Sequence, residues 1–136
     1  MMLKYLLQFN VNADISEAEE INELLNSEID INDRIMIQEQ INNSRKAYRK
    51  LIVLFDNLQN DLFENENKLN KLMRNVYLNC DNRVDASKIM QTDPEIIAVK
   101  EAIEALKMSM KTVSNHMDLV KSDLRILNSA MYNKNI

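Results

Sequence analysis

The longest regular pattern in the sequence is a row of apolar residues that recurs in alternating steps of four and three. It runs from Ile37 to Val76, and ten of its twelve positions are apolar or tyrosine. A seven-residue repeat sustained over this length is typical of a long helix that pairs with another helix, as in a coiled coil. It predicts a helix over residues 37–77. The row consists of Ile37, Ile41, Ser44, Tyr48, Leu51, Phe55, Leu58, Leu62, Asn65, Leu69, Leu72 and Val76.

Two members of this row, Ser44 and Asn65, are polar. A polar residue buried in such a row can fix the register or the oligomeric state at some cost in stability. Alternatively, each side chain leaves the packed face locally. The sequence is compatible with either interpretation.

A second row, from Ile96 to Met131, alternates steps of three and four with no polar member. Thr92-Asp93-Pro94-Glu95 precedes it and provides an N-cap, a proline in the first turn and an acid at the positive end of the helix. This predicts a helix over residues 93–132, longer than about 50 Å at about 1.5 Å per residue. The row consists of Ile96, Val99, Ile103, Leu106, Met110, Val113, Met117, Val120, Leu124, Leu127 and Met131.

Residues 78–91 lie between the two rows and show no sustained period. Asn79, Asp81, Asn82, Asp85 and Ser87 compete locally for backbone hydrogen bonds, as is typical of turns. We interpret this segment as the connection, so that the two long helices form an elongated antiparallel hairpin. The sequence thus predicts an all-α body over residues 37–136.

The first 36 residues form an acidic arm ahead of this body. Residues 1–40 contain nine acids against Lys4 and Arg34, a local net charge of −7, whereas the other 96 residues carry 15 basic and 12 acidic side chains. Within Asn12–Ser27, a short helix from Ile15 would place Ile21, Leu24 and Leu25 on its apolar side. An acidic arm beside a mildly basic body can contact different partners, although a solvated acidic helix face explains the arm equally well.

The two long helices carry more apolar surface than one hairpin can bury. Beside its main row, the second helix has a row at seven-residue spacing that includes Leu119 and Ile126, and the first helix is apolar all round at Leu51–Phe55. We therefore expect an oligomeric bundle or ring, with the acidic N-terminal helix folding over the hairpin as the competing explanation. Candidate interface residues are Leu51, Phe55, Leu119, Leu124, Ile126 and Leu127.

Composition argues against most enzyme classes. The chain has no glycine, one cysteine and one histidine. Phosphate-cradling loops, dinucleotide fingerprints and nucleophile elbows need glycine, and one histidine with one cysteine cannot form a conventional zinc site. We expect no enzymatic activity, no metal and no cofactor, with His116 structural or exposed and Cys80 an inert thiol.

The sequence predicts no membrane anchor. The longest apolar run, Leu51–Phe55, is far below the roughly 20 residues that span a bilayer. Residues 1–9 are too short and too interrupted for a signal peptide. We therefore expect a cytoplasmic protein, where a lone reduced cysteine is ordinary.

Basic residues follow the outward side of the first long helix. Four cations occur within Arg45–Lys50, and further cations continue toward and into the connection, with Tyr77 as the best aromatic for stacking on a base. Repeated around an oligomer, such patches suit single-stranded nucleic acid, whereas a solvated surface is the alternative. The candidate nucleic-acid-binding residues are Lys46, Arg49, Lys50, Lys68, Lys71, Arg74, Tyr77 and Arg83.

The order of these features resembles the UvsY family of recombination mediators from T-even-like phages. The resemblance is carried by Lys68–Tyr77, by Asp93-Pro94-Glu95-Ile96 and by Met117–Ile126, and it covers roughly residues 65–132. It implies a hexameric or heptameric ring, located in an infected bacterial cell, that binds single-stranded DNA and helps to load the phage recombinase in place of the single-strand binding protein. The family's DNA-contacting basic residues correspond to Lys71 and Arg74.

Two other functions remain open from the sequence. One is a structural helical-bundle protein whose partner is another helix and which binds no nucleic acid. The other is an enzyme whose active site is supplied by a partner chain. Because a structural coiled coil has no need of a basic face, binding to single strands that falls steeply with salt separates the first of these from a mediator.

Overall fold

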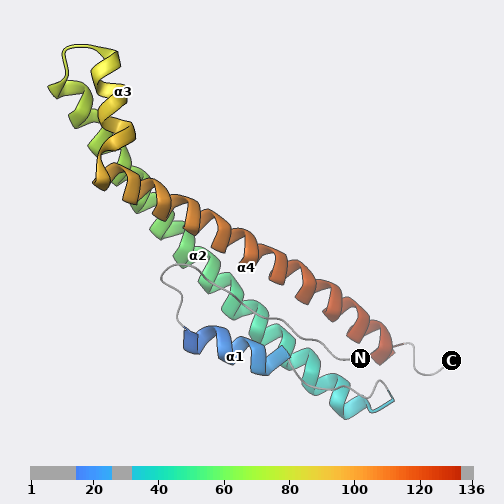
Figure 1. Ribbon diagram of the computed structural model, residues 1–136. Helices are drawn as coiled ribbons and strands as arrows, with labels where there is room; N and C mark the ends of the chain where they lie inside the picture. Colours follow the sequence, from blue (N-terminus) through green and yellow to red (C-terminus); the bar gives the residue numbers. More distant parts are fainter. Residues whose placement is uncertain (1–14, 26–31, 133–136) are drawn as a thin grey trace.

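The computed structural model describes residues 15–25 and 32–132, and within these ranges the protein consists of helices without strands. The helices are α1 (Ile15–Leu25), α2 (Arg34–Asn79), α3 (Arg83–Thr92) and α4 (Pro94–Tyr132) (Figure 1). The predicted all-α class is confirmed. Residues 1–9, considered above as a leader, and the acids Asp14, Glu28 and Asp30 of the arm lie outside the described residues.

The two long helices, α2 and α4, lie side by side and run in opposite directions (Figure 1). With 46 and 39 residues, they extend about 69 and 58 Å at about 1.5 Å per residue. Near the chain ends, the Arg34 guanidinium donates a hydrogen bond of 3.3 Å from Nη2 to the carbonyl oxygen of Met131. This bond ties the first turn of α2 to the last turn of α4. None of the described helices combines the length and apolar character needed to cross a membrane.

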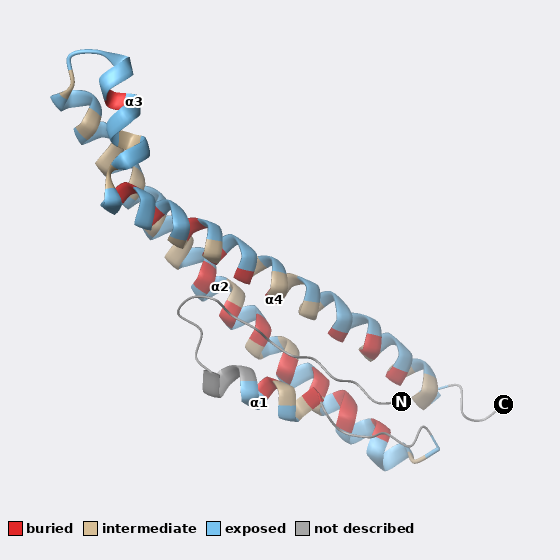
Figure 2. Ribbon diagram, viewed as in Figure 1, coloured by how far each residue is buried: buried red, intermediate tan, exposed pale blue. Residues whose placement is uncertain are grey.

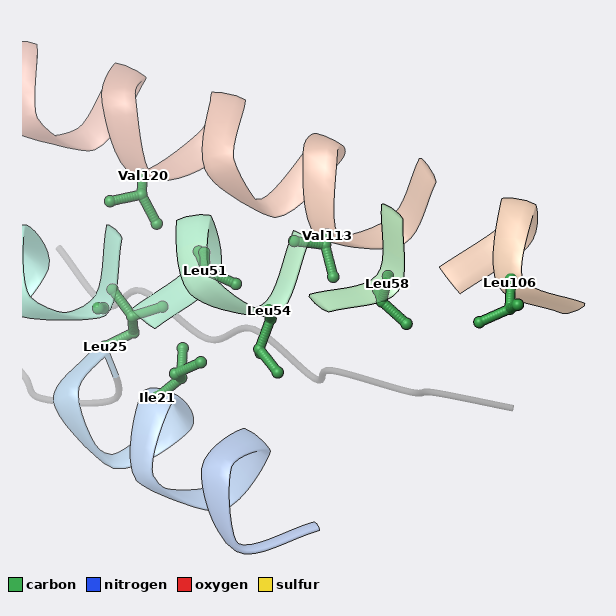
Figure 3. Close-up of a cluster of buried hydrophobic side chains, with 9 residues drawn as sticks. Ile21, Leu25, Leu51, Leu54, Leu58, Leu106, Val113 and Val120 are labelled. Carbon is green, nitrogen blue, oxygen red and sulfur yellow. The ribbon is translucent and has the colours of Figure 1, made fainter. Parts of the chain in front are cut away.

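A continuous apolar core fills the space between α2, α4 and α1 (Figures 2 and 3). Its α4 members and its α2 members Leu51 and Leu58 come from the two rows that define the predicted helices, whereas Ala47 and Leu54 lie beside the α2 row. A second, smaller cluster seals the end where α2 begins and α4 ends. The main cluster consists of Ile21, Leu25, Ala47, Leu51, Leu54, Leu58, Leu106, Val113 and Val120, and the smaller one of Ile37, Ile41 and Leu127.

Two residues that we assigned to an oligomer interface belong to these intramolecular clusters instead. Leu51 is 0% exposed and Leu127 is 1% exposed within a single chain. Neither side chain has surface left for a second copy of the chain, so the structure corrects this assignment. The reason is that α1 and α4 together already cover the side of α2 on which Leu51 lies.

The short helix α1 packs on α2, with the predicted apolar side facing inward (Figure 3). Ile21 and Leu25 are fully buried against the core, and Leu24 is half-buried there. The Gln40 amide Nε2 donates a hydrogen bond of 3.2 Å to the carbonyl of Leu24, which satisfies one of the carbonyls that a helix end leaves open. Folding of the acidic helix over α2 therefore accounts for part of the apolar surface discussed above.

The two polar interruptions of the α2 row behave differently. Ser44 is completely buried, and its Oγ accepts a hydrogen bond of 3.4 Å from Gln40 Nε2. Asn65 is half-buried, and its Nδ2 donates to the Asp61 carbonyl one turn earlier at 2.8 Å. Ser44 is thus a buried polar member of the packed row, whereas the Asn65 side chain turns back onto its own helix.

The predicted connection is itself largely helical, because α3 occupies Arg83–Thr92. Asn82 caps this helix: its Oδ1 accepts from the backbone N–H of Asp85 at 2.9 Å. The polar residues that indicated a turn therefore serve as a cap, and Ala86, 1% exposed, anchors α3 to the neighbouring helices. Residues 78–91 join the two long helices as expected, but only residues 80–82 among them are non-helical.

The start of α4 has the predicted cap geometry. Asp93 Oδ1 accepts from the backbone N–H groups of Glu95 at 2.8 Å and Ile96 at 3.4 Å, and Pro94 occupies the first helical position. Asp93→Ala should lower the free energy of unfolding by about 1 kcal/mol, because these donors lose their acceptor. Chemical denaturation measures this, and Asp93→Asn should retain most of the stability. Asp81→Ala, an exposed acid outside the helices, is the control; an equal loss there would contradict the cap argument.

Candidate nucleic-acid interface

Two stretches of α2 contain cations and no acid. The first basic stretch, residues 40–55, carries Arg45, Lys46, Arg49 and Lys50, and the second basic stretch, residues 67–79, carries Lys68, Lys71 and Arg74. Eighteen residues separate Lys50 from Lys68, which corresponds to about 27 Å along the helix axis at about 1.5 Å per residue. All of these cations except Lys50 are exposed. The long helix therefore presents two separate positive regions.

The first basic stretch is partly neutralised by α1. Lys50 Nζ lies 3.0 Å from Glu20 Oε1, and both side chains remain partly exposed at 38% and 56%. An ion pair this open contributes little to stability, but it places a carboxylate on the flank of the first basic stretch. Glu19 and Glu23 of the same helix are exposed as well. The acidic arm consequently weakens the positive potential of this region.

The nearest acids to the second basic stretch on its own helix are the exposed Glu64 and Glu66, four and two residues before Lys68. Within residues 15–25 and 32–132, none of Lys68, Lys71 and Arg74 makes an ion pair. Tyr77, one turn after Arg74, is 53% exposed. The structure therefore leaves three cations and one aromatic ring accessible near the end of α2, where the sequence predicts binding.

Arg83, the last of the predicted binding residues, lies at the start of α3. It is exposed, but Asp81 and Asp85 stand two residues before and after it. Because carboxylates so close reduce the local potential, Arg83 adds little positive field. The second basic stretch is thus the more strongly positive part of this end of the molecule.

One cation of α4 belongs to the packing between the long helices. Lys121 Nζ lies 5.6 Å from the centroid of the Tyr48 ring, within the range of a cation–π contact. Tyr48 itself is half-buried against the core, as its place in the row predicts. Lys100 and Lys107, on the same row of α4 as Lys121, are exposed.

The residues considered for other chemistry have ordinary surroundings. His116 Nδ1 lies 2.7 Å from the Thr112 carbonyl oxygen of its own helix, and Cys80 is a half-buried free thiol at the C-cap of α2. Across the described ranges 15–25 and 32–132, no group of three or more His, Cys, Asp or Glu residues could hold a metal ion. Neither residue therefore indicates a reactive site in this part of the chain.

The remaining candidate interface residues fall into two groups. Leu119 and Ile126 are 48% and 49% exposed on α4, so they have surface available for another helix. Phe55 and Leu124 are half-buried and pack against the intramolecular core. Only the first pair therefore keeps the accessibility that contact with a second copy requires.

Sequence reasoning missed one exposed aromatic residue of α2. Phe63 is 66% exposed, although large apolar side chains are usually buried. It precedes Tyr77 by fourteen residues, or two seven-residue repeats, so both rings lie on one side of the helix. That spacing is the signal that could have identified it.

Comparison with family models, with characterised proteins and with solved structures finds no match. The resemblance of residues 65–132 to recombination mediators therefore stays a hypothesis. The main indication of a function is the accessible second basic stretch of this chain.

Proposed function

We propose that this protein binds single-stranded DNA as a homo-oligomer and acts as a recombination mediator. The observation that carries the proposal is the second basic stretch: Lys68, Lys71 and Arg74 are exposed, free of ion pairs within the described residues and followed by the exposed Tyr77. Cations recognise the phosphates of any strand, and an exposed ring stacks on bases. Cations and an exposed ring can therefore bind a single strand of any base sequence, and such binding requires no catalytic residue.

Oligomerisation makes the weak patch of each chain effective. Three cations contribute only a modest affinity, but copies joined around a ring present their patches to one strand at high effective concentration. The exposed Leu119 and Ile126 supply apolar surface for such an assembly. The resemblance adds the mediator role, namely helping a phage recombinase to replace the single-strand binding protein on the DNA.

The test is binding of a labelled thymidine oligonucleotide over a range of salt concentrations. Lys71→Ala with Arg74→Ala removes two exposed cations, so the slope of log affinity against log salt should fall by about 1.4. The affinity at low salt should drop on all single strands alike. The mass of the assembly should not change, because neither side chain belongs to the core clusters.

Lys107→Ala with Lys111→Ala is the matched control, because it removes the same charge from exposed positions of α4. It should leave most of the binding intact. An equal loss from both pairs would mean general charge attraction without a site on α2. Unchanged binding by the Lys71 and Arg74 variant over the full salt range would instead favour the second candidate function, a structural helical-bundle protein, for which the exposed apolar residues of α4 are the supporting observation.

A further inference from the structure

Two exposed aromatic rings stand on the outward side of α2. Phe63 is 66% exposed and Tyr77 is 53% exposed. The fourteen residues between them correspond to about 21 Å along the helix axis at about 1.5 Å per residue. Burying an aromatic ring is one of the largest sources of apolar stabilisation. Two rings left in solvent on one face therefore indicate a surface that something else covers.

Three polar residues connect the two rings along the same face. Asn67, Asn70 and Arg74 continue the steps of four, three, four and three from Phe63 to Tyr77, and all three are exposed. We refer to Phe63, Asn67, Asn70, Arg74 and Tyr77 as the outer stripe. A face for packing another helix needs an apolar residue at nearly every turn, whereas every turn between the two rings of the outer stripe is polar. The pattern is that of a polar ligand with flat apolar parts.

We propose that the outer stripe is a track for single-stranded nucleic acid, with bases stacked on Phe63 and Tyr77 and a phosphate held by Arg74 between them. This inference rests on the proposed function and specifies the site at which it occurs. The amides of Asn67 and Asn70 can donate to and accept from base edges. A strand at the stacked spacing of 3.4 Å per nucleotide covers the 21 Å between the rings with about six nucleotides.

The charge distribution orients this track. Lys71 and Arg74 lie within six residues of Tyr77, whereas the exposed acids Glu64 and Glu66 lie one and three residues after Phe63. The Tyr77 end therefore binds through phosphate contacts and stacking, and the Phe63 end through stacking alone. Loss of the Phe63 ring should consequently weaken binding without changing its salt dependence, because stacking releases few counterions.

The absence of tryptophan from the chain permits a direct test. Phe63→Trp and Tyr77→Trp each introduce a single tryptophan at an exposed position, and thymidine oligonucleotides should quench the tryptophan emission of both variants. Quenching at both positions by one oligonucleotide should require about six nucleotides. Met108→Trp, at a position of α4 that is 59% exposed, is the control and should not be quenched.

Affinity supplies the second measurement. Phe63→Ala should weaken oligonucleotide binding about tenfold, as expected for loss of one stacking contact, and the salt slope should stay the same. Phe63→Tyr should bind the oligonucleotide with the affinity of the wild type, since tyrosine retains an aromatic face. Circular dichroism of each variant checks that the helices remain, which is expected for an exposed position.

The outcomes separate this inference from the proposed function. Salt-dependent binding by the wild-type chain, with no quenching at position 63 and no effect of Phe63→Ala, would overturn the outer stripe and leave the proposed function standing. Absence of any binding by the wild-type chain would overturn both. A fluorescence change at position 63 that follows protein concentration without DNA would show that a second copy covers this face, which also overturns the track.

Discussion

Replacing Leu51 by alanine should lower the free energy of unfolding by about 2–5 kcal/mol, the usual cost of removing a buried leucine side chain. Leu51 is completely buried and belongs to the cluster in which α1, α2 and α4 meet (Figure 3). Loss of its side chain leaves a cavity lined by all three helices. Urea denaturation followed by circular dichroism measures the effect.

Val53→Ala is the matched control, because Val53 lies two residues away on the same helix and is 54% exposed. Its effect should stay within about 0.5 kcal/mol, as for surface substitutions generally. The loss at Leu51 should also be independent of protein concentration, since its contacts lie within one chain. If the difference in unfolding free energy between the wild type and Leu51→Ala disappears when both proteins are diluted, Leu51 lies in an interface between copies.

The seven-residue rows predicted the two long helices because many of their residues, such as Leu51, Leu58 and Val113, form the intramolecular core. The expected bounds, 37–77 and 93–132, coincide with the structure at Tyr132 and differ from it by one to three residues at the other three helix ends. Helix ends depend on single caps such as Asp33, whose Oδ1 accepts from the backbone N–H groups of Ile35 and Met36. The apolar period does not contain that information.

The short helix α3 was missed because its sequence is too short to show a period. Ten residues give fewer than three turns, and the polar residues before it have the same composition as a turn. The helix contacts both α2 and α4, and Ala86 is its buried residue. Packing against the long helices therefore accounts for the helical conformation of residues 83–92, which the local sequence did not indicate.

For the candidate site, the sequence identified accessible cations but not their neighbours. The exposed Lys46, Arg49, Lys71 and Arg74 follow from their outward positions in the repeat. The Lys50 contact with Glu20 does not, because it depends on where α1 docks. The same docking buries Leu51, so a side of α2 that seemed to need a second copy is covered by the chain itself.

A row of residues on α4 retains the apolar surface that could support assembly. Leu119 and Ile126 are about half exposed and lie seven residues apart, so they occupy equivalent positions two turns apart on one face. Ile97, 37% exposed, and Met108, 59% exposed, extend this apolar face toward the start of the helix, because they lie about six and about three turns before Leu119. Contact with a second copy would remove the Leu119 and Ile126 side chains from water, which is the main source of stabilisation in obligate assemblies.

Replacing both Leu119 and Ile126 by aspartate should convert the assembly to a smaller species, because four or more carboxylates would then meet in the contact between two copies without partners. Both positions are exposed in the single chain, so the helical content and the unfolding midpoint of the dissociated species should change little. Light scattering coupled to size-exclusion chromatography measures the mass. Lys107→Asp, which places a carboxylate at an exposed position about 120° around α4 from Leu119, should preserve the assembly. A monomeric wild-type protein at micromolar concentration would contradict assembly altogether, and dissociation by Lys107→Asp alone would move the contact to that side of α4.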